Sequence, residues 1–351
     1  MTGTEPPAPV PGSPPEEPGA PVRYLGISAG WLRQWGISLA SLVGGVLTLF
    51  VFQRGLPHVS LIIGYVLLLW LLVAVVVQTR EALESSGKKV HRLVLTATEY
   101  TIQTLYHGVL LFLIPAYYAA ATLTSVNACF VALLVALALL ATFDPWYQVI
   151  VHPRPWVRAI FFIVSLFGAL NLALPLVRVP PIFALVLSAW IATVGITPMV
   201  CRARGWRWSR GLLATATVGV VVVVIVSLVR VWIPPAPLFL AKATLAWNVG
   251  SVDSMEPPSP IPARELSERG LVAYTAIYAP AGLRQPVEHV WRRDGRIVDV
   301  VKLTPVEGGR REGYRTFSRK AGFPERPQGR WTVDVMTGSG QLIGRLRFRV
   351  V

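Results

Sequence analysis

Cysteine and charge are both scarce in this chain, and each shortage excludes a class of protein. The 351 residues include only two cysteines, Cys129 and Cys201, and neither follows residue 232. A disulfide-rich scaffold or a CxxC site is therefore excluded. Charged residues make up 15% of the chain and hydrophobic residues 53%, with a mean hydropathy of +0.55. Soluble domains rarely reach such values, so a membrane protein is predicted.

Motifs for enzymatic chemistry are also missing. The chain has no P-loop, no GxGxxG after a strand and no HExxH. The five histidines are scattered, which predicts no metal site and no cofactor. Ser318, His289 and Asp299 could be imagined as a triad, but no nucleophile elbow accompanies them. The sequence therefore assigns no enzymatic activity.

Long apolar runs fill the first two thirds of the chain. A run of about 20 apolar residues spans a bilayer as a helix. Seven transmembrane helices are predicted: Trp35–Phe52, Val59–Val77, Thr101–Leu123, Val126–Phe143, Val157–Leu176, Ile182–Val200 and Gly211–Trp232.

Basic residues indicate how these helices are oriented. With a cytoplasmic N-terminus, the inside segments hold 12 Lys and Arg and the short outside loops hold only Arg54 and Arg178. This bias follows the positive-inside rule, and an odd number of spans then places the C-terminal tail outside the cytoplasm. The predicted location is a bacterial inner membrane with a periplasmic C-terminal domain. A basic tail outside the cytoplasm argues against nucleic acid as a partner.

Four segments follow from the change of pattern along the chain. Residues 1–34 are predicted to be a disordered, Pro-rich cytoplasmic N-terminus, and 35–232 a seven-helix transmembrane domain. Residues 233–263 are predicted to be a Pro-rich linker, and 264–351 an exported β domain.

Short runs with β-branched and aromatic residues mark the tail. They are Leu271–Tyr278, Val287–Trp291, Ile297–Leu303, Tyr314–Arg319, Trp331–Met336 and Leu342–Val350. Ala241–Trp247 is a candidate for a seventh strand. Runs at this spacing, separated by glycine turns, predict a small all-β, immunoglobulin-like sandwich, with a half-open barrel as the alternative.

The tail also resembles a known family. The residues that carry the likeness are His289 and Trp291, Asp294-Gly295, Tyr314-Arg315-Thr316 with Ser318 and Lys320, Gly329 to Val333, and Gly340 to Phe348. In this order they resemble the exported domain of unknown function 2914, found in bacterial membrane proteins after a multi-helix region. Asp144 to Tyr147, His152-Pro153 and Asn171-Leu172 are similar to that multi-helix partner. The resemblance implies a membrane location and a sandwich-like domain, and no known activity.

Two groups of candidate ligand-binding residues lie in the tail. His289 and Trp291 share one face of a strand, either as a platform for a glycan or peptide or as buried core in which the histidine bonds a neighbour. Arg345, Arg347 and Arg349 alternate on the last strand. They are interpreted either as a basic surface for lipid phosphate or acidic glycan, or as a solvated face that blocks edge aggregation.

Polar residues inside the apolar region form a third group of candidates. His107, Asp144, His152 and Asn171 could serve a proton or solute pathway, since polar groups in a membrane are rare. The alternative places Asp144 and His152 in an interfacial segment. Small residues at Ala184, Ser188 and Ala192 allow close helix packing, within the bundle or in a homo-oligomer.

Three functions remain open from the sequence. The first is an anchored binding or scaffold protein whose exported domain binds an envelope protein, a glycan or a membrane lipid headgroup. The second is a transporter or membrane-embedded enzyme that uses His107, Asn171 and Asp144. The third is a transmembrane sensor that relies on a partner for its output.

Overall fold

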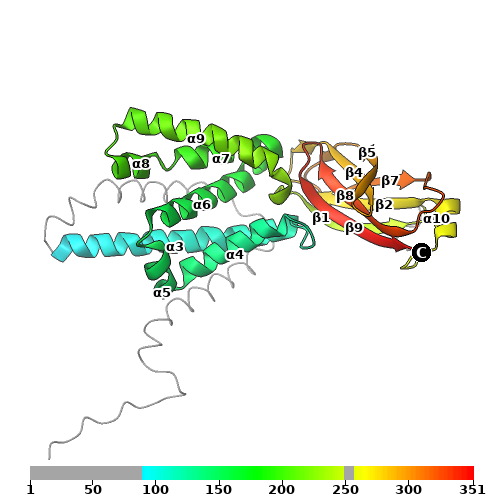
Figure 1. Ribbon diagram of the computed structural model, residues 1–351, viewed down its shortest axis with the longest axis horizontal. Helices are drawn as coiled ribbons and strands as arrows, with labels where there is room; N and C mark the ends of the chain where they lie inside the picture. Colours follow the sequence, from blue (N-terminus) through cyan, green and yellow to red (C-terminus); the bar gives the residue numbers. More distant parts are fainter. Residues whose placement is uncertain (1–88, 249–256) are drawn as a thin grey trace, which may run out of the picture.

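The computed structural model describes residues 89–248 and 257–351. They form a helical region followed by an all-β domain of antiparallel sheets, which lies at one end of the helices (Figure 1). The predicted spans Trp35–Phe52 and Val59–Val77 and the N-terminal segment 1–34 lie outside the described residues.

The helical region runs from residue 89 to residue 232. Its elements are α3 (Lys89–Ala120), α4 (Ala128–Thr142), α5 (Asp144–Trp146), the π-helical turn η1 (Tyr147–Val151), α6 (Pro155–Leu176), α7 (Pro181–Val194), α8 (Thr197–Arg204), α9 (Trp208–Leu228) and the 3₁₀ turn η2 (Arg230–Trp232). A proline at the first position starts α6 and α7, where its missing N–H costs no hydrogen bond. Gly205 ends α8 in the left-handed conformation.

The prediction of seven transmembrane helices is not supported. Within the described residues, three helical segments are long and apolar enough to cross a membrane: Pro155–Leu176, Pro181–Arg204 and Trp208–Leu228. A fourth is counted if Ala128–Thr142 and Asp144–Val151, which meet at a 96° bend, form one broken span.

Two physical reasons account for the lower number. α4 has 15 residues, so it rises only about 22 Å, short of the roughly 30 Å of a hydrocarbon core. α3 is long enough, but Glu99, Gln103 and His107 follow one another at four-residue intervals in its first half and make it less apolar.

The helices pack on one another as a bundle. α3 packs on α4 and α6, and α7 packs on α6 and α9. Ala184, Ser188 and Ala192 of α7 are fully buried, so the small-residue repeat serves packing inside the bundle. α9 exposes most of its valines and leucines, as a lipid-facing helix would.

The β domain begins earlier than the sequence pattern indicated. Its elements are β1 (Phe239–Ala246), α10 (Ala263–Arg269), β2 (Leu271–Tyr278), β3 (Arg284–Gln285), β4 (Val287–Arg293), β5 (Arg296–Lys302), β6 (Val306–Glu307), β7 (Tyr314–Lys320), β8 (Gly329–Thr337) and β9 (Leu342–Val350). The additional strand suggested at Ala241–Trp247 is confirmed as β1, which pairs with β2 over its whole length.

Two antiparallel sheets enclose the core of this domain. One has the order β1-β2-β7, the other β5-β4-β8-β9, and β3 and β6 form a short separate pair. The alternation along β8 directs Trp331, Val333 and Val335 into the core, where they meet Trp291 and Phe348. Trp331 stacks on Phe348, which is its cross-strand partner in β9. β1 and β9 are edge strands of the two sheets.

A buried junction joins the bundle to the β domain. The segment 233–238, which lies in the predicted linker, is buried throughout. The side chain of Gln341 donates to the Ile233 carbonyl over 3.4 Å, and the side chain of Asn127 donates to the Leu342 carbonyl over 3.3 Å. The first residues of β9 therefore rest against the end of the helical bundle.

Candidate functional site

His289 and Trp291 lie in the interior of the sandwich. Both side chains are 0% exposed, so they form no surface platform for a ligand. Of the two interpretations of this pair, the structure agrees with the second: the two residues are buried in the core, and the histidine bonds its neighbours. The physical reason is the strand alternation, which places them on the face of β4 that Val287 also shares.

A chain of hydrogen bonds links this pair to the opposite sheet. His289 Nδ1 lies 2.8 Å from Ser318 Oγ, and His289 Nε2 lies 3.1 Å from Thr275 Oγ1. The indole N–H of Trp291 donates to Ser318 Oγ over 3.1 Å. These roles fit a neutral imidazole that accepts at Nδ1 and donates at Nε2. Burial lowers the pKa of His289 to about 4, which favours the neutral ring.

The imagined triad does not form. Ser318 and His289 are in contact, but Asp299 hydrogen-bonds Lys320 over 2.8 Å and does not orient the histidine. The Lys320 ammonium holds the pKa of the Asp299 carboxyl below its usual value. Ser318 is 2% exposed, so a substrate has no access to it.

The arginines of β9 lie on the outer face of their sheet and differ in their surroundings. Arg345 donates through Nη2 to Asp334 Oδ2 over 2.9 Å, and Arg292 Nε donates to the same oxygen over 3.0 Å. Asp334 is 2% exposed. Arg345 thus neutralises a buried carboxylate as part of the domain's own structure.

Arg347 and Arg349 remain available to a partner. Both side chains are exposed, and Arg347 Nη2 donates to the Thr124 carbonyl of the α3–α4 loop over 2.9 Å. Arg330 of β8 is exposed as well and lies directly across from Arg349. Within the described part of the chain, these three arginines form no ion pair with a carboxylate, so a positive charge persists on this face.

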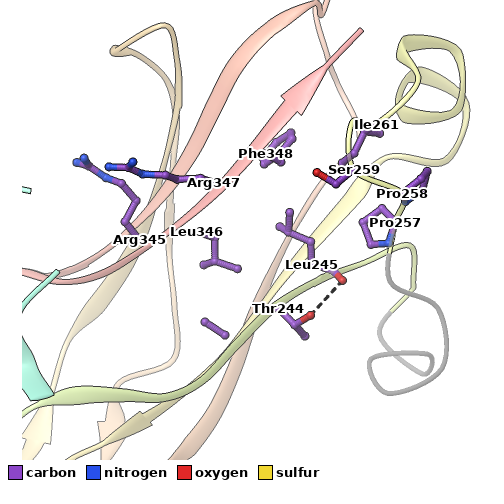
Figure 2. A pocket seen from close by; sticks show the side chains of 11 residues that line it. Thr244, Leu245, Pro257, Pro258, Ser259, Ile261, Arg345, Leu346, Arg347 and Phe348 are labelled. Carbon is purple, nitrogen blue, oxygen red and sulfur yellow. Dashed lines mark hydrogen bonds between the residues drawn. The ribbon is translucent and has the colours of Figure 1, made fainter. Parts of the chain in front are cut away.

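A groove separates the edge strands β1 and β9 (Figure 2). Its volume is about 350 Å³, within the range of ligand sites in proteins. Its lining residues are Ala243, Thr244, Leu245, Pro257, Pro258, Ser259, Ile261, Arg345, Leu346, Arg347 and Phe348. Figure 2 shows the guanidinium groups of Arg345 and Arg347 extending together away from Leu346 and Phe348.

The groove opens because the two edge strands approach only at one end. Near the bundle, the position of a Cβ on Gly344 would lie 2.1 Å from Leu240 Cδ1, so the absence of a side chain permits close contact between β9 and β1. Farther along, the strands leave space between them. The sequence identified Arg345 and Arg347 but not the groove. The packing of β1 beside β9 brings distant residues together and leaves no local pattern in the sequence.

The polar candidates of the bundle bond one another between helices. His107 Nδ1 lies 2.8 Å from Thr142 Oγ1. Gln103, one helical turn before His107, donates to Asp144 Oδ1 over 2.6 Å and to the Ala141 carbonyl over 3.0 Å. The structure therefore brings His107 and Asp144 to the place where α3 meets the end of α4 and the start of α5. Gln103 was not a candidate, although its spacing of four from His107 could have indicated it.

Asn171 and His152 have separate surroundings. Asn171 Nδ2 donates to the Tyr117 hydroxyl over 3.0 Å, and that hydroxyl donates to the Gly168 carbonyl over 3.0 Å. His152 Nδ1 lies 3.8 Å from Glu99 Oε2, and both side chains are about one third exposed. No group of three His, Cys, Asp or Glu side chains that could hold a metal ion occurs in the described residues.

Two family models match the chain. The family of unknown function DUF5924 matches residues 28–273, and the protein of unknown function DUF2914 matches residues 284–350. The second match confirms the resemblance from β3 to β9, and the first match ends inside β2. No curated protein and no solved structure matches.

Proposed function

The chain belongs to the DUF5924 family of unknown function, and we propose that it is an integral membrane protein of the bacterial cell envelope whose exported β domain binds a ligand. The helical bundle anchors the protein, and the immunoglobulin-like domain stands outside the cytoplasmic membrane. The observation that carries the proposal is the groove between β1 and β9, which has the exposed Arg347 among its lining residues and the exposed Arg349 farther along the same strand.

The distribution of charge in the bundle supports this orientation. The basic residues of the α6 start, α8 and the α9 start lie at the end of the bundle away from the β domain (Figure 1): Arg154, Arg158, Arg202, Arg204, Arg207 and Arg210. Cytoplasmic ends of membrane helices are enriched in such residues. The β domain then faces the periplasm.

The orientation is testable with a reporter. Alkaline phosphatase fused after Val351 is active only if the C-terminus is outside the cytoplasm, and a green fluorescent protein at the same point is bright only if it is inside. We expect high phosphatase activity and no fluorescence. The opposite pattern would contradict an exported β domain.

The binding role is testable by crosslinking in living cells. A photo-crosslinking amino acid at Arg347 reaches the rim of the groove, and the same group at Arg319, which is exposed on β7 of the other sheet, is the matched control. We expect adducts with an envelope component at position 347 and none at position 319. Equal yields at both positions, or no adduct at either, would contradict a ligand site at the groove.

One observation favours a second function, a transporter or membrane-embedded enzyme. Gln103 and His107 of α3 contact Asp144 at the start of α5 and Thr142 at the end of α4. Polar groups within membrane helices commonly serve ion or solute passage. This candidate predicts a proton flux in proteoliposomes, measured with a pH-sensitive dye. His107→Leu and Asp144→Asn would abolish that flux, and Asn171→Leu in the separate Tyr117 pair is the comparison.

A further inference from the structure

The open edge of β9 points to the chemistry of the ligand. We propose that the groove between β1 and β9 receives an extended, acidic peptide segment of a partner protein, which adds as a strand to β9. This inference rests on the proposed binding function and names its partner class.

Two hydrogen bonds with Ile261 show which way the main-chain groups of β9 point. The Ile261 amide donates to the Arg349 carbonyl over 2.8 Å, and the Val351 amide donates to the Ile261 carbonyl over 3.1 Å. Residues 349 and 351 therefore direct their amide and carbonyl groups away from β8. These groups alternate along a strand, so Arg345 and Arg347 direct theirs to the same open side.

Next to the Ile261 bridge, none of the described residues pairs with this open side. In the described residues, the main-chain hydrogen bonds on this side of β9 are those that Ile261 and Ala263 form with Arg349 and Val351, at the end of the strand. The preceding residues line the groove but include Pro257, Pro258 and Pro260, which have no amide hydrogen to donate. An incoming peptide finds main-chain partners at Arg345 and Arg347, and Ile261 already shows the parallel mode of pairing.

The side chains of β9 specify what the added strand carries. Residues of neighbouring strands alternate between the same two faces. The inner face of the groove is apolar, with Leu245, Leu346 and Phe348 along it. The outer face carries Arg347 and Arg349 beside Arg330. A strand that alternates apolar and acidic residues satisfies both faces, whereas a glycan or a lipid headgroup leaves the main-chain groups of β9 unused.

A set of matched probes tests the peptide class with the full-length protein in nanodiscs. The probe is a fluorescent peptide that alternates valine and glutamate, and binding is followed by fluorescence anisotropy. One comparison peptide replaces glutamate by lysine. Another is methylated at alternate amides, so that it keeps its charge but cannot pair as a strand. A heparin oligosaccharide and phosphatidylglycerol vesicles represent the anionic glycan and the lipid surface.

We expect saturable binding of the valine–glutamate peptide, and a loss of at least roughly tenfold in affinity with either comparison peptide. Arg347→Glu should weaken binding by a similar factor, and Arg319→Glu, the same charge change on β7, should leave it unchanged. Hydrogen exchange at β9 amides should slow when the peptide is bound.

Three results would overturn the inference, and they separate it from the proposed function. Equal affinity for the methylated peptide would show attraction by charge without strand addition. Saturable, Arg347-dependent binding of heparin or of vesicles in place of the peptide would retain the binding function and replace its partner class. Absence of saturable binding to every probe, together with absence of crosslinks at position 347, would contradict both the peptide inference and the proposed binding function. The prolines and arginines would then serve only to protect the edge of the sheet.

Discussion

The buried imidazole of His289 makes the stability of the β domain dependent on pH. Its ring accepts from Ser318 and donates to Thr275, so a second proton would remove an acceptor and place a charge in the core. In the unfolded chain the same ring takes up a proton near the ordinary pKa of 6.5, whereas in the folded domain it does so only near about 4. Between these values the unfolded state binds more protons than the folded state, and stability falls as the pH falls.

The magnitude follows from the separation of the two pKa values. Each pKa unit corresponds to about 1.4 kcal/mol, so the full effect is about 3 kcal/mol when the pH has fallen through 4. By about pH 5 the loss is about 2 kcal/mol. This is a large share of the roughly 5–15 kcal/mol that stabilises a typical domain. Above about pH 7.5 the contribution is constant, because the ring is neutral in both states.

Hydrogen exchange of the β4 and β8 amides measures this effect in the full-length protein. After correction for the intrinsic exchange rate, the opening free energy should drop by about 2 kcal/mol between about pH 7.5 and about pH 5. His289→Gln, which keeps a donor but does not titrate here, should lower stability at neutral pH and flatten the pH dependence. His152→Gln in the helical region is the control that leaves the slope intact. The reasoning is refuted if the slope persists in His289→Gln.

Two further pairs of substitutions test packing and charge in the β domain. A Cβ at Gly308 would lie 1.7 Å from the Pro280 carbonyl oxygen, so Gly308→Ala should cost about 2 kcal/mol of unfolding free energy, while Gly322→Ala, which meets no atom within 4 Å, should be neutral. Equal thermal stability of the two alanine variants would contradict this packing. Asp334→Asn removes the charge between two arginines and should cost about 2 kcal/mol. Asp299→Asn breaks an ion pair in which the Asp299 side chain is 42% exposed, and it should cost less than Asp334→Asn by the same unfolding measurement.

The sequence predicted the positions of most strands and of the last three apolar helices well, because period and composition are local properties. The strand runs from Leu271 to Val350 correspond to β2, β4, β5, β7, β8 and β9 within a few residues. The last three predicted spans coincide with the three helical segments that are apolar enough to cross a membrane. These predictions depend only on the alternation of apolar and polar side chains and on the length of apolar runs.

What the sequence did not predict depends on contacts between distant residues. The sequence left open whether His289 and Trp291 lie in the core or on the surface. Their burial depends on packing against β7, where Ser318 bonds both side chains. Within the described residues, five spans were predicted and three or four candidates are present, because α4 is short and bends into α5 and the first half of α3 is less apolar. The groove arises where β1 and β9 part, although more than 90 residues separate them in sequence.

β1 shows why the β domain is not separable at the predicted linker. It pairs with β2, while Leu238, Trp247 and Ile261 are buried in the same cluster as Trp291. Burial of each such side chain is worth roughly 2 kcal/mol, so a fragment of residues 264–351 loses about 6 kcal/mol, comparable with the net stability of a small domain. We expect that fragment to be unfolded by near-ultraviolet circular dichroism and residues 233–351 to be folded.

The need of the β domain for β1 also affects how the two family matches and the groove are understood. The DUF5924 match ends within β2, so β1 and the start of β2 belong to one matched region and the remaining strands to the other. β1 is also one wall of the groove, and β9 is the other. A ligand site at this place therefore requires both regions in one chain. A folded, stable fragment 264–351 that still binds the acidic peptide would show instead that β9 alone is sufficient.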